Sequence, residues 1–367
     1  AYSATLVPIY STLAANALAA NDATAAFRYA QNVDVLNNSW GFGGLLSSGT
    51  NWAFLDNARS PQFAPAFQAL EKLAQQGRQG LGTVVVQAAG NGFDVGDDTN
   101  LHNFQNSRYV ITVGATGFGG KAAEYSATGA SVLVAAPGGT SGGGWGSILT
   151  TDRLGAAGYN DTGFVWSDGT SFAAPLVSGI VALMLEANPR LGYRDVQQIL
   201  AYTARSTVTT GGTFEDNAGT HWNGGGLRFD SILHTLGFGQ VDALGAVRLA
   251  AAWDRPALTA ANMVEANGKQ TVLKTIPDNT LQGIFQSLSI SQDIVVERAE
   301  VTVRINHSFI GDQSIMLLSP AGTISTLLWR PAQGALSAFG SSQDNIDFTF
   351  STVLNWGESS RGDWSLY

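Results

Sequence analysis

The sequence predicts an α/β domain with a doubly wound parallel sheet, followed by an all-β domain. In the first two thirds of the chain, continuous Val- and Ile-rich runs alternate with segments of helical periodicity, as in parallel strands that are buried on both faces. After about Trp253 the pattern changes to short alternating segments separated by turn residues. The length of 367 residues is also too great for one ordinary core. We therefore expect two domains, residues 1–254 and 255–367, with a boundary signal at Arg255-Pro256.

The first domain is expected to alternate strands and helices. The predicted strands are residues 33–37, 83–88, 109–113 and 131–134, and the predicted helices are residues 64–75, 171–187 and 191–204. In such a series the functional sites lie at the carboxyl ends of the strands.

The second domain shows the alternation of β-strands. Residues 295–305 alternate apolar with polar side chains, and further apolar runs follow at residues 315–318, 324–328 and 348–353. Because turn residues separate these runs, we expect a β-sandwich. The chain ends inside a strand-like segment, and its first residues, Ala1 to Thr5, do not resemble a natural start. We therefore expect it to be a fragment, incomplete at both ends.

The composition excludes several classes of protein. The net charge of −9 argues against a nucleic-acid partner, because a phosphate backbone favours a basic face. No apolar run reaches the roughly 18 residues that span a bilayer, and residues 179–187 fit a buried helix better. Cysteine is absent, so a disulfide framework is excluded. We expect an exported protein, secreted or periplasmic.

Ser171 is the strongest candidate for a reactive residue. It lies in the sequence Gly-Thr-Ser-Phe-Ala-Ala-Pro at residues 169–175, which fits a junction between a loop and a helix. Pro175 is tolerated in a first helical turn, and a serine there has a free N–H at the positive end of the helix dipole. The free N–H and the positive end of the helix dipole both favour an oxyanion beside the serine. The alternative is an ordinary N-cap serine, which would be the better interpretation if the sequence contained only an isolated Thr-Ser pair.

Two further segments end strands on the same predicted edge of the sheet. Asn91 follows residues 88–90, Ala-Ala-Gly, where its amide can donate to an oxyanion. Residues 38–41, Asn-Ser-Trp-Gly, can present an extended backbone that pairs with a substrate strand. Taken alone, each segment also fits an ordinary turn.

In this order, the three segments resemble the subtilisin superfamily of serine proteases. The resemblance covers residue 1 to about Trp253 and includes residues 4–9, 186–189 and 237–243. It implies that Ser171 is the nucleophile and Asn91 the oxyanion donor. It also implies a substrate cleft lined by Ser39, Trp40, Gly41, Ala88, Ala89 and Gly90.

The second domain is similar to the P domain of the kexin and furin branch. The matching segments are residues 307–312, 317–323, 356–358 and 362–364. The resemblance implies a jelly-roll sandwich that packs on the catalytic domain and stabilises it. Arg361-Gly362-Asp363 fits the strand entry of this fold better than an integrin motif.

The resemblance breaks at the other two members of the catalytic triad. A protease of this type needs a His as base and an Asp that orients it, and in this family both precede the serine. Only His102 precedes Ser171, and it falls in the loop after Asn91. We expect an upstream segment, or a companion chain from the same protease, to supply Asp and His.

The pocket for the residue before the cleaved bond also departs from that branch. Its acidic residues are replaced by residues 42–44, Phe-Gly-Gly, by His102 and by Ala127, which predicts a preference for apolar or small residues. Asp97 alone matches a calcium-ligand position of the branch. With Asp94 and Asp98 in the same loop, a structural Ca²⁺ is one interpretation and a solvated acidic loop is the other.

The function that we predict is a serine endopeptidase that hydrolyses peptide bonds of proteins or peptides through an acyl-enzyme. This chain alone is expected to be inactive, because it lacks the base. The alternative is a non-catalytic binding or scaffold protein built on a protease fold. A lipase or esterase is disfavoured, because Ser171 does not lie in a Gly-x-Ser-x-Gly elbow.

Overall fold

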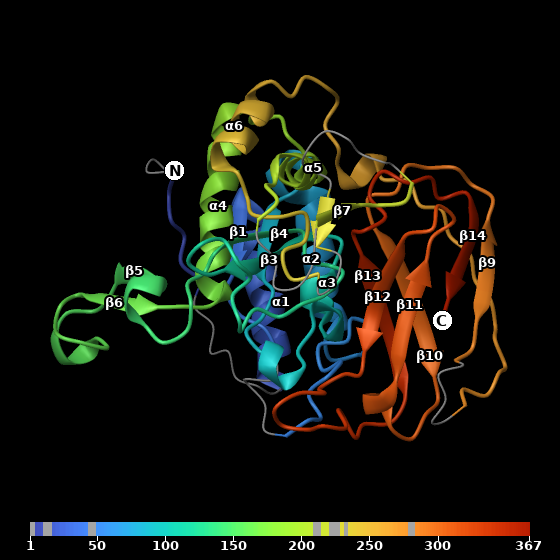
Figure 1. Cartoon of the computed structure of the whole chain (residues 1–367). Coiled ribbons are helices and arrows are strands. Elements are labelled where there is room, and N and C mark those ends of the chain that lie inside the picture. The colour runs from blue at the N-terminus through green and yellow to red at the C-terminus, as the bar shows by residue number, and fades with distance from the viewer. Residues whose placement is uncertain are drawn as a thin grey trace.

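The computed structural model describes residues 4–9, 17–42, 49–207, 214–219, 228–230, 234–277 and 283–367. The first part of the chain forms an α/β unit, and the last part forms a β unit that packs beside it (Figure 1).

The α/β unit is organised around a parallel sheet. Its four strands are β1 (Val35–Asn38), β2 (Val84–Ala88), β3 (Val110–Thr116) and β4 (Val134–Pro137), and their order in the sheet is β1-β2-β3-β4. Every residue of β2 and β3 is buried, so both faces of these strands are covered. This explains their unbroken apolar sequence. The fourth strand begins later than predicted, because Val132 N–H bonds to Gly129 O in a turn that precedes it.

Helices cover both faces of the sheet (Figure 1). Helices α1 (Ala17–Tyr29) and α2 (Ala64–Gln76) share a core with Val85, and helices α4 (Thr170–Ala187), α5 (Tyr193–Thr203) and α6 (Ala243–Ala251) share a core with Val84 and Val86. Successive side chains of a strand point to opposite faces, so the two helix groups lie on opposite sides. The short helix α3 (Asn103–Asn106) precedes β3. The predicted fold class is confirmed for this unit.

Helix α4 is the one helix in the described residues that is long and apolar enough to cross a membrane by length and composition. Its Ala173, Val177 and Val181 are buried in the core that includes the sheet residues Val86 and Val113. This packing is that of a core helix in a folded domain.

The β unit is a sandwich of antiparallel strands. Its strands are β9 (Gln286–Ile290), β10 (Ala299–Ile305), β11 (Ser314–Leu318), β12 (Ile324–Trp329), β13 (Ile346–Thr352) and β14 (Gly362–Leu366). One sheet has the order β12-β11-β14-β9 and the other pairs β10 with β13. Alternate residues such as Ile315, Leu317, Phe348 and Phe350 point into the shared core. The expected all-β domain is thus confirmed.

The two units share part of their cores. Trp52 and Leu101 of the α/β unit belong to the same apolar cluster as Phe348. Asn100 Nδ2 donates to Ser351 O at 3.0 Å, and Ser351 N–H donates to Asn100 Oδ1 at 2.9 Å. These buried bonds fix the β unit against the loop that follows Asn91.

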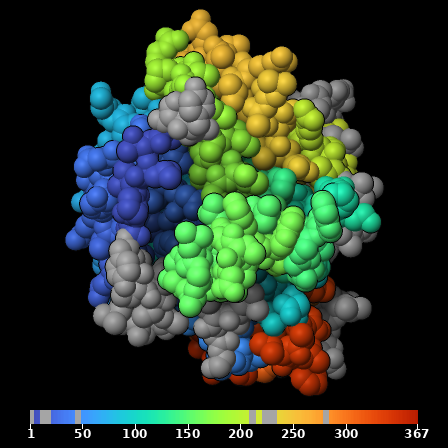
Figure 2. Space-filling model, turned by 90° about the vertical axis from the view of Figure 1, so that its left-hand side faces the viewer, coloured from blue at the N-terminus to red at the C-terminus, as the bar shows by residue number. Residues whose placement is uncertain are grey.

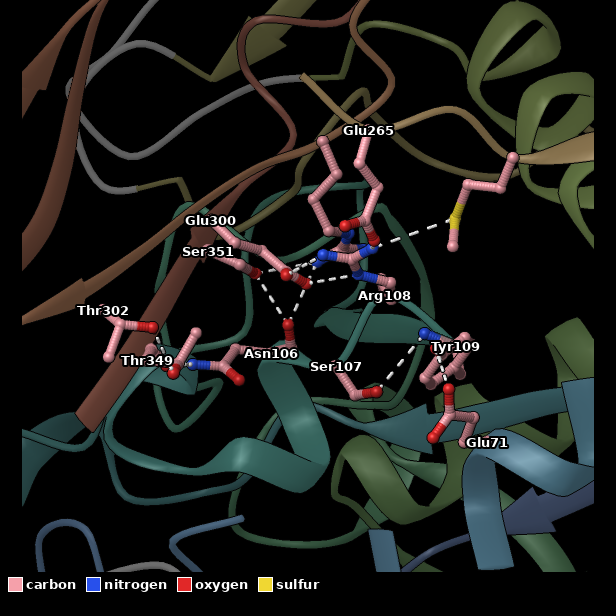
Figure 3. Close-up of polar contacts among 12 residues, drawn as sticks. Glu71, Asn106, Ser107, Arg108, Tyr109, Glu265, Glu300, Thr302, Thr349 and Ser351 are labelled. Atoms are coloured by element: carbon pink, nitrogen blue, oxygen red, sulfur yellow. Dashed lines mark hydrogen bonds and ion pairs between the residues drawn. The ribbon is translucent and has the colours of Figure 1, made fainter. Parts of the chain in front are cut away.

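A charged contact closes one side of this interface (Figure 3). Arg108, just before β3, pairs with Glu300 on β10 and with Glu265 in the connection between the units. Hydrogen bonding to Glu300 raises the pKa of the Arg108 guanidinium, although its burial opposes this. Nearby, Tyr109 OH donates to Glu71 of α2 at 3.3 Å. The contact therefore joins both units and the connection between them.

Two small hairpins complete the described structure. Strands β5 (Ile148–Thr151) and β6 (Phe164–Ser167) form an arm that projects from the α/β unit, and Figure 2 views the molecule with this arm in front. Strands β7 (Phe214–Asp216) and β8 (Arg228–Asp230) form the other. The arm leads directly into Ser171, and its Trp145 and Tyr159 are almost fully exposed.

Candidate active site

Ser171 lies in the first turn of α4, as predicted. Gly169 precedes the helix with φ 139°, a conformation that favours glycine, and a Cβ there would lie 3.2 Å from Asn91 Nδ2. In the described residues, Ser171 N–H has no hydrogen-bond partner. The Ser171 hydroxyl contacts Ser39 O at 3.3 Å. The side chain therefore lies at the positive end of the helix with a free donor beside it.

Pro175 lies deeper in the helix than predicted. It is the sixth residue of α4, so it is in the second turn and not the first. At this position its missing N–H deprives Ser171 O of a helical donor. Ser39 Oγ donates to that carbonyl at 3.0 Å instead. Pro175 thus leaves Ser171 O free to accept a hydrogen bond from Ser39, which follows the end of β1.

The side chain of Asn91 is held in one orientation by Thr170. Thr170 N–H and Thr170 Oγ1 both donate to Asn91 Oδ1 at 2.8 Å. Since a backbone N–H can only donate, this contact identifies the oxygen of the amide. Asn91 Nδ2 has no hydrogen-bond partner in the described part of the chain. Two free donors, Asn91 Nδ2 and Ser171 N–H, thus lie beside Gly169, 3.2 Å and 3.7 Å from the point that a Cβ on this residue would occupy.

The predicted cleft residues divide into two groups. Ser39 and Gly90 lie at the serine, since Ser39 bonds to Ser171 and Gly90 N–H contacts Thr170 Oγ1 at 3.2 Å. Ala88 and Ala89 are buried, and Ala89 N–H is used in a bond to Val113 O.

Trp40 and Gly41 lie beside an aromatic cluster. The Trp40 ring packs 5.3 Å from Phe104, and a Cβ on Gly41 would collide with Gln105. The role of these residues in substrate binding stays a prediction.

A cavity of about 400 Å³ adjoins Asn91, and the sequence did not reveal it. It is lined by Asn91, Asp94, Glu124, Tyr125, Ser141 and Asp168. Tyr125 OH donates to Gly138 O at 2.7 Å and accepts from Gly169 N–H at 2.9 Å, so it holds the loop before Ser171. Burial, together with the nearby Glu124, raises the pKa of Asp168. No local pattern marks Tyr125, because its partners lie far along the chain.

No histidine contacts Ser171 within the described residues. His102 is fully buried, with Nε2 2.8 Å from Asp97 Oδ1 and Nδ1 3.4 Å from Asp56 Oδ1. Burial lowers its pKa, but the two carboxylates outweigh burial and raise the pKa to about 10. His307 lies in the β unit, and His221 lies outside the described residues. A base from another segment or chain stays a prediction.

The loop around Asp97 does not fit a calcium ion. Ca²⁺ takes six to eight oxygen ligands. Asp97 Oδ1 faces His102, and the Asp98 oxygens accept from Asn100 N–H and Thr128 Oγ1. Within the residues that the structure describes, no three His, Cys, Asp or Glu side chains are grouped to hold a metal. Protein groups therefore engage Asp97 Oδ1 and both oxygens of Asp98, while Asp97 Oδ2 is buried without a hydrogen-bond partner in the described part of the chain.

At the pocket positions where the kexin branch has acidic residues, the described residues are apolar side chains and His102. Phe42 packs 5.3 Å from Phe63 in the aromatic cluster, and Ala127 is fully buried. Gly43 and Gly44 lie outside the described residues. His102 is engaged by two carboxylates. The expected loss of preference for basic residues stays a prediction.

Comparison with known proteins identifies the family of this chain. The profile described as "Subtilase family" matches residues 1–232. The chain belongs to the subtilase family. A second profile, "Proprotein convertase P-domain", matches residues 296–367. The boundary that we predict at Arg255-Pro256 falls between these matches and stays a prediction.

Curated relatives connect this subtilase with the kexin branch. A PC3-like endoprotease variant B of Hydra vulgaris is 34% identical over 82% of this chain and 40% of its own length. Kexin of Saccharomyces cerevisiae is 32% identical over 82% of this chain and 34% of its own. The resemblance to this branch is thereby confirmed. The chain spans less than half the length of these two relatives.

Solved structures support the fold. The serine protease of Aeromonas sobria superposes with a TM-score of 0.71 at 24% identity, over 91% of this chain and 64% of its own. Because the identity is low, this likeness supports the arrangement of a subtilase unit and a β unit and nothing finer.

Proposed function

We propose that this chain is the nucleophile-bearing part of an exported serine endopeptidase that acts through an acyl-enzyme. The observation that carries the proposal is the pair of free donors, Ser171 N–H and Asn91 Nδ2, beside Gly169. Preorganised donors of this kind stabilise the oxyanion that forms when a hydroxyl attacks a carbonyl. Membership in the subtilase family supports the same chemistry.

The proposed reaction is that of a serine protease. Ser171 Oγ attacks the carbonyl carbon of the peptide bond, and its proton passes to a histidine base. The carbonyl oxygen becomes negative and accepts hydrogen bonds from Ser171 N–H and Asn91 Nδ2. The histidine returns the proton to the leaving amine as the C–N bond breaks. Water then attacks the acyl-enzyme, the base removes its proton, and Ser171 Oγ recovers a proton as the acid product leaves.

We further propose that the base and its orienting Asp dock along β1 and α4. Strand β1 is at an edge of the described sheet, so one row of its backbone groups is free to pair with another strand. Beside it, Leu176 on α4 is 45% exposed, although it is apolar. Among the residues that the structure describes, Asn38 Nδ2 at the end of β1 is buried and has no hydrogen-bond partner. A docked strand and helix would satisfy these groups and bring side chains to Ser171.

The proposed substrates are proteins or peptides with an apolar or small residue before the cleaved bond. Phe42 and Ala127 supply no carboxylate for a basic side chain, and the raised pKa of His102 favours its positively charged form. As an alternative, the chain is a binding protein on a protease fold. That reading is favoured by one observation, the contact of Ser171 Oγ with Ser39 O where a base would be needed.

The test uses the longest natural form of the protein, with Ser171→Ala as its control. Quenched fluorescent peptides with Phe, Ala, Arg or Lys-Arg before the cleaved bond measure kcat/KM. We expect hydrolysis that depends on Ser171 and is fastest after Phe or Ala. Efficient cleavage after Lys-Arg would overturn the proposed specificity. An absence of cleavage in a form that contains Asp and His segments would favour the binding protein.

A further inference from the structure

His102 lies at the centre of a closed group of buried side chains, here called the His102 cluster: His102, Asp56, Asp97 and Trp52. Each of the four is at most 2% exposed. One ring nitrogen faces Asp97 at 2.8 Å and the other faces Asp56 at 3.4 Å. The imidazole stacks on Trp52 with centroids 5.9 Å apart and an angle of 8°.

The position of His102 between two carboxylates favours a positive charge on its ring. Nε2 forms a hydrogen bond with Asp97 Oδ1, whereas Nδ1 lies at ion-pair distance from Asp56 Oδ1, 3.4 Å away, without a hydrogen bond between them. An imidazolium opposes the charge of both carboxylates, and a neutral imidazole opposes neither. Two buried carboxylates without a counter-charge would be strongly unfavourable. In many proteins a metal ion neutralises such a pair, but here the side chain of His102 occupies the space between them. Asp56 Oδ2 also accepts from Phe104 N–H at 2.8 Å, which anchors the far side of the cluster.

On its other side, the cluster supports the loop that carries Asn91. Asp97 Oδ2 lies against both neighbours of Asn91: a Cβ on Gly90 would be 3.1 Å from this atom, and one on Gly92 would be 3.0 Å away. Asp97 N–H also donates to Gly92 O at 2.9 Å. A displacement of the Asp97 carboxylate would therefore move the backbone on either side of the oxyanion donor.

The cluster also reaches the β unit. Trp52 belongs to the apolar cluster that contains Phe348. Two residues further along the chain, Phe54 packs 4.6 Å from Phe348, and Asp56 follows. His102 therefore lies between the segment on which the β unit docks and the loop that holds Asn91.

We propose that His102 is a positioning residue for proteolysis, whose imidazolium replaces a metal ion between Asp56 and Asp97 and holds the Asn91 loop in register with the β unit. Its effect on turnover rests on the proposed function, whereas its effect on the loop does not.

The first experiment compares amide hydrogen exchange in the wild type, His102→Gln and the control His307→Gln. His307 lies in the β unit and contacts Phe309 and Gln313, away from the loop. We expect His102→Gln to speed exchange at residues 90–97 at least about tenfold, and His307→Gln to leave it unchanged. In the active protease, kcat should fall about 10- to 100-fold with little change in KM, because the oxyanion donor is misplaced. Unchanged exchange at residues 90–97 in folded His102→Gln would overturn the proposal.

The second experiment distinguishes the imidazolium from a metal. With ¹⁵N-labelled histidine, wild-type His102 should show two protected ring N–H protons at neutral pH, and a single one would overturn the proposal. Chelator should change neither the melting temperature nor the exchange of the wild type. His102→Asp places three carboxylates together, so its melting temperature should become calcium-dependent. A wild type that loses loop protection in chelator and regains it with Ca²⁺ would contradict the account. These measurements need no turnover, so they remain decisive if Ser171 proves unreactive.

Discussion

The serine site and the His102 cluster lie on the two sides of the same loop, and their polar groups differ: the first has two donors with no group opposite them in the described residues, and the second has an imidazole between two carboxylates. At the serine, Ser171 N–H and Asn91 Nδ2 are without partners among the described residues. In the cluster, both ring nitrogens of His102 lie within ion-pair distance of a carboxylate and all members are buried, although only the contact between Nε2 and Asp97 is a hydrogen bond. Unpaired donors are costly unless a ligand uses them, whereas opposed charges hold geometry. In our proposal the first region reacts, and the second region positions it.

The largest effect should come from Ser171→Ala. Removing the nucleophile should lower kcat by on the order of 10⁴-fold or more, because the acyl-enzyme cannot form. The melting temperature should change little, since the hydroxyl has one contact of 3.3 Å. Peptide hydrolysis and thermal unfolding of the same preparation measure both. Retained hydrolysis would assign the activity to another residue.

Asn91→Leu should have the next largest effect. It removes one of the two free donors and should lower kcat about 10²- to 10³-fold while KM stays near its wild-type value. That magnitude was established on subtilisin, a member of this same family. Thr170→Val is the matched control, because it keeps the Asn91 amide but removes one of the two donors to its oxygen. It should cost less, and an equal loss would show that Thr170 does more than orient Asn91.

The His102 cluster predicts how stability depends on pH. The folded-state pKa of about 10 lies above the ordinary value of 6.5, so the stabilisation is complete below pH 6.5 and is lost as the pH rises through 10. The imidazolium faces Asp97 and Asp56, with Asp98 close by. Burial raises the pKa of Asp98 to about 7, which lowers stability between pH 4 and 7 in the same direction. Urea unfolding from pH 5 to 10 measures the slope.

The variant His102→Gln separates the contribution of His102 to the pH dependence of stability from that of Asp98. It should flatten the profile between pH 6.5 and 10 and keep the decline between pH 4 and 7. A wild-type profile that is flat between pH 7 and 10 would show that His102 is neutral in the folded protein.

Ser39→Ala should have the smallest effect. It removes the donor to Ser171 O, whose helical donor is already missing because of Pro175. The loss of this bond should cost about 1 kcal/mol and lower kcat only a few-fold. Pro175→Ala tests the same idea, because the new N–H can replace the Ser39 donor. If Ser39→Ala is harmless only in the presence of Pro175→Ala, the interpretation holds.

Local sequence was sufficient for several of the elements and for the position of Ser171 at the start of a helix. Short apolar patterns predict strands β2 and β3. The pattern of glycine, serine and apolar residues predicts a helix start within one residue of the observed start of α4. The orientation of Asn91 could not be predicted, because its partner Thr170 is 79 residues away. The same holds for Asp56, whose pairing with His102 depends on how the chain folds back. The sequence left calcium and a solvated acidic loop open for Asp97, because it shows the acidic neighbours and not that the ring of His102 lies 2.8 Å from Asp97 Oδ1.

The most direct measurement is covalent labelling of the assembled protein with a fluorophosphonate, followed by mass spectrometry of the labelled peptide. The account predicts one modified residue, Ser171, with labelling that requires the segment or chain that supplies Asp and His. Labelling should be slower in Asn91→Leu and absent in Ser171→Ala. A modified residue elsewhere, or an unmodified Ser171 in a form that contains the Asp and His segments, would contradict the assignment of Ser171 as the nucleophile.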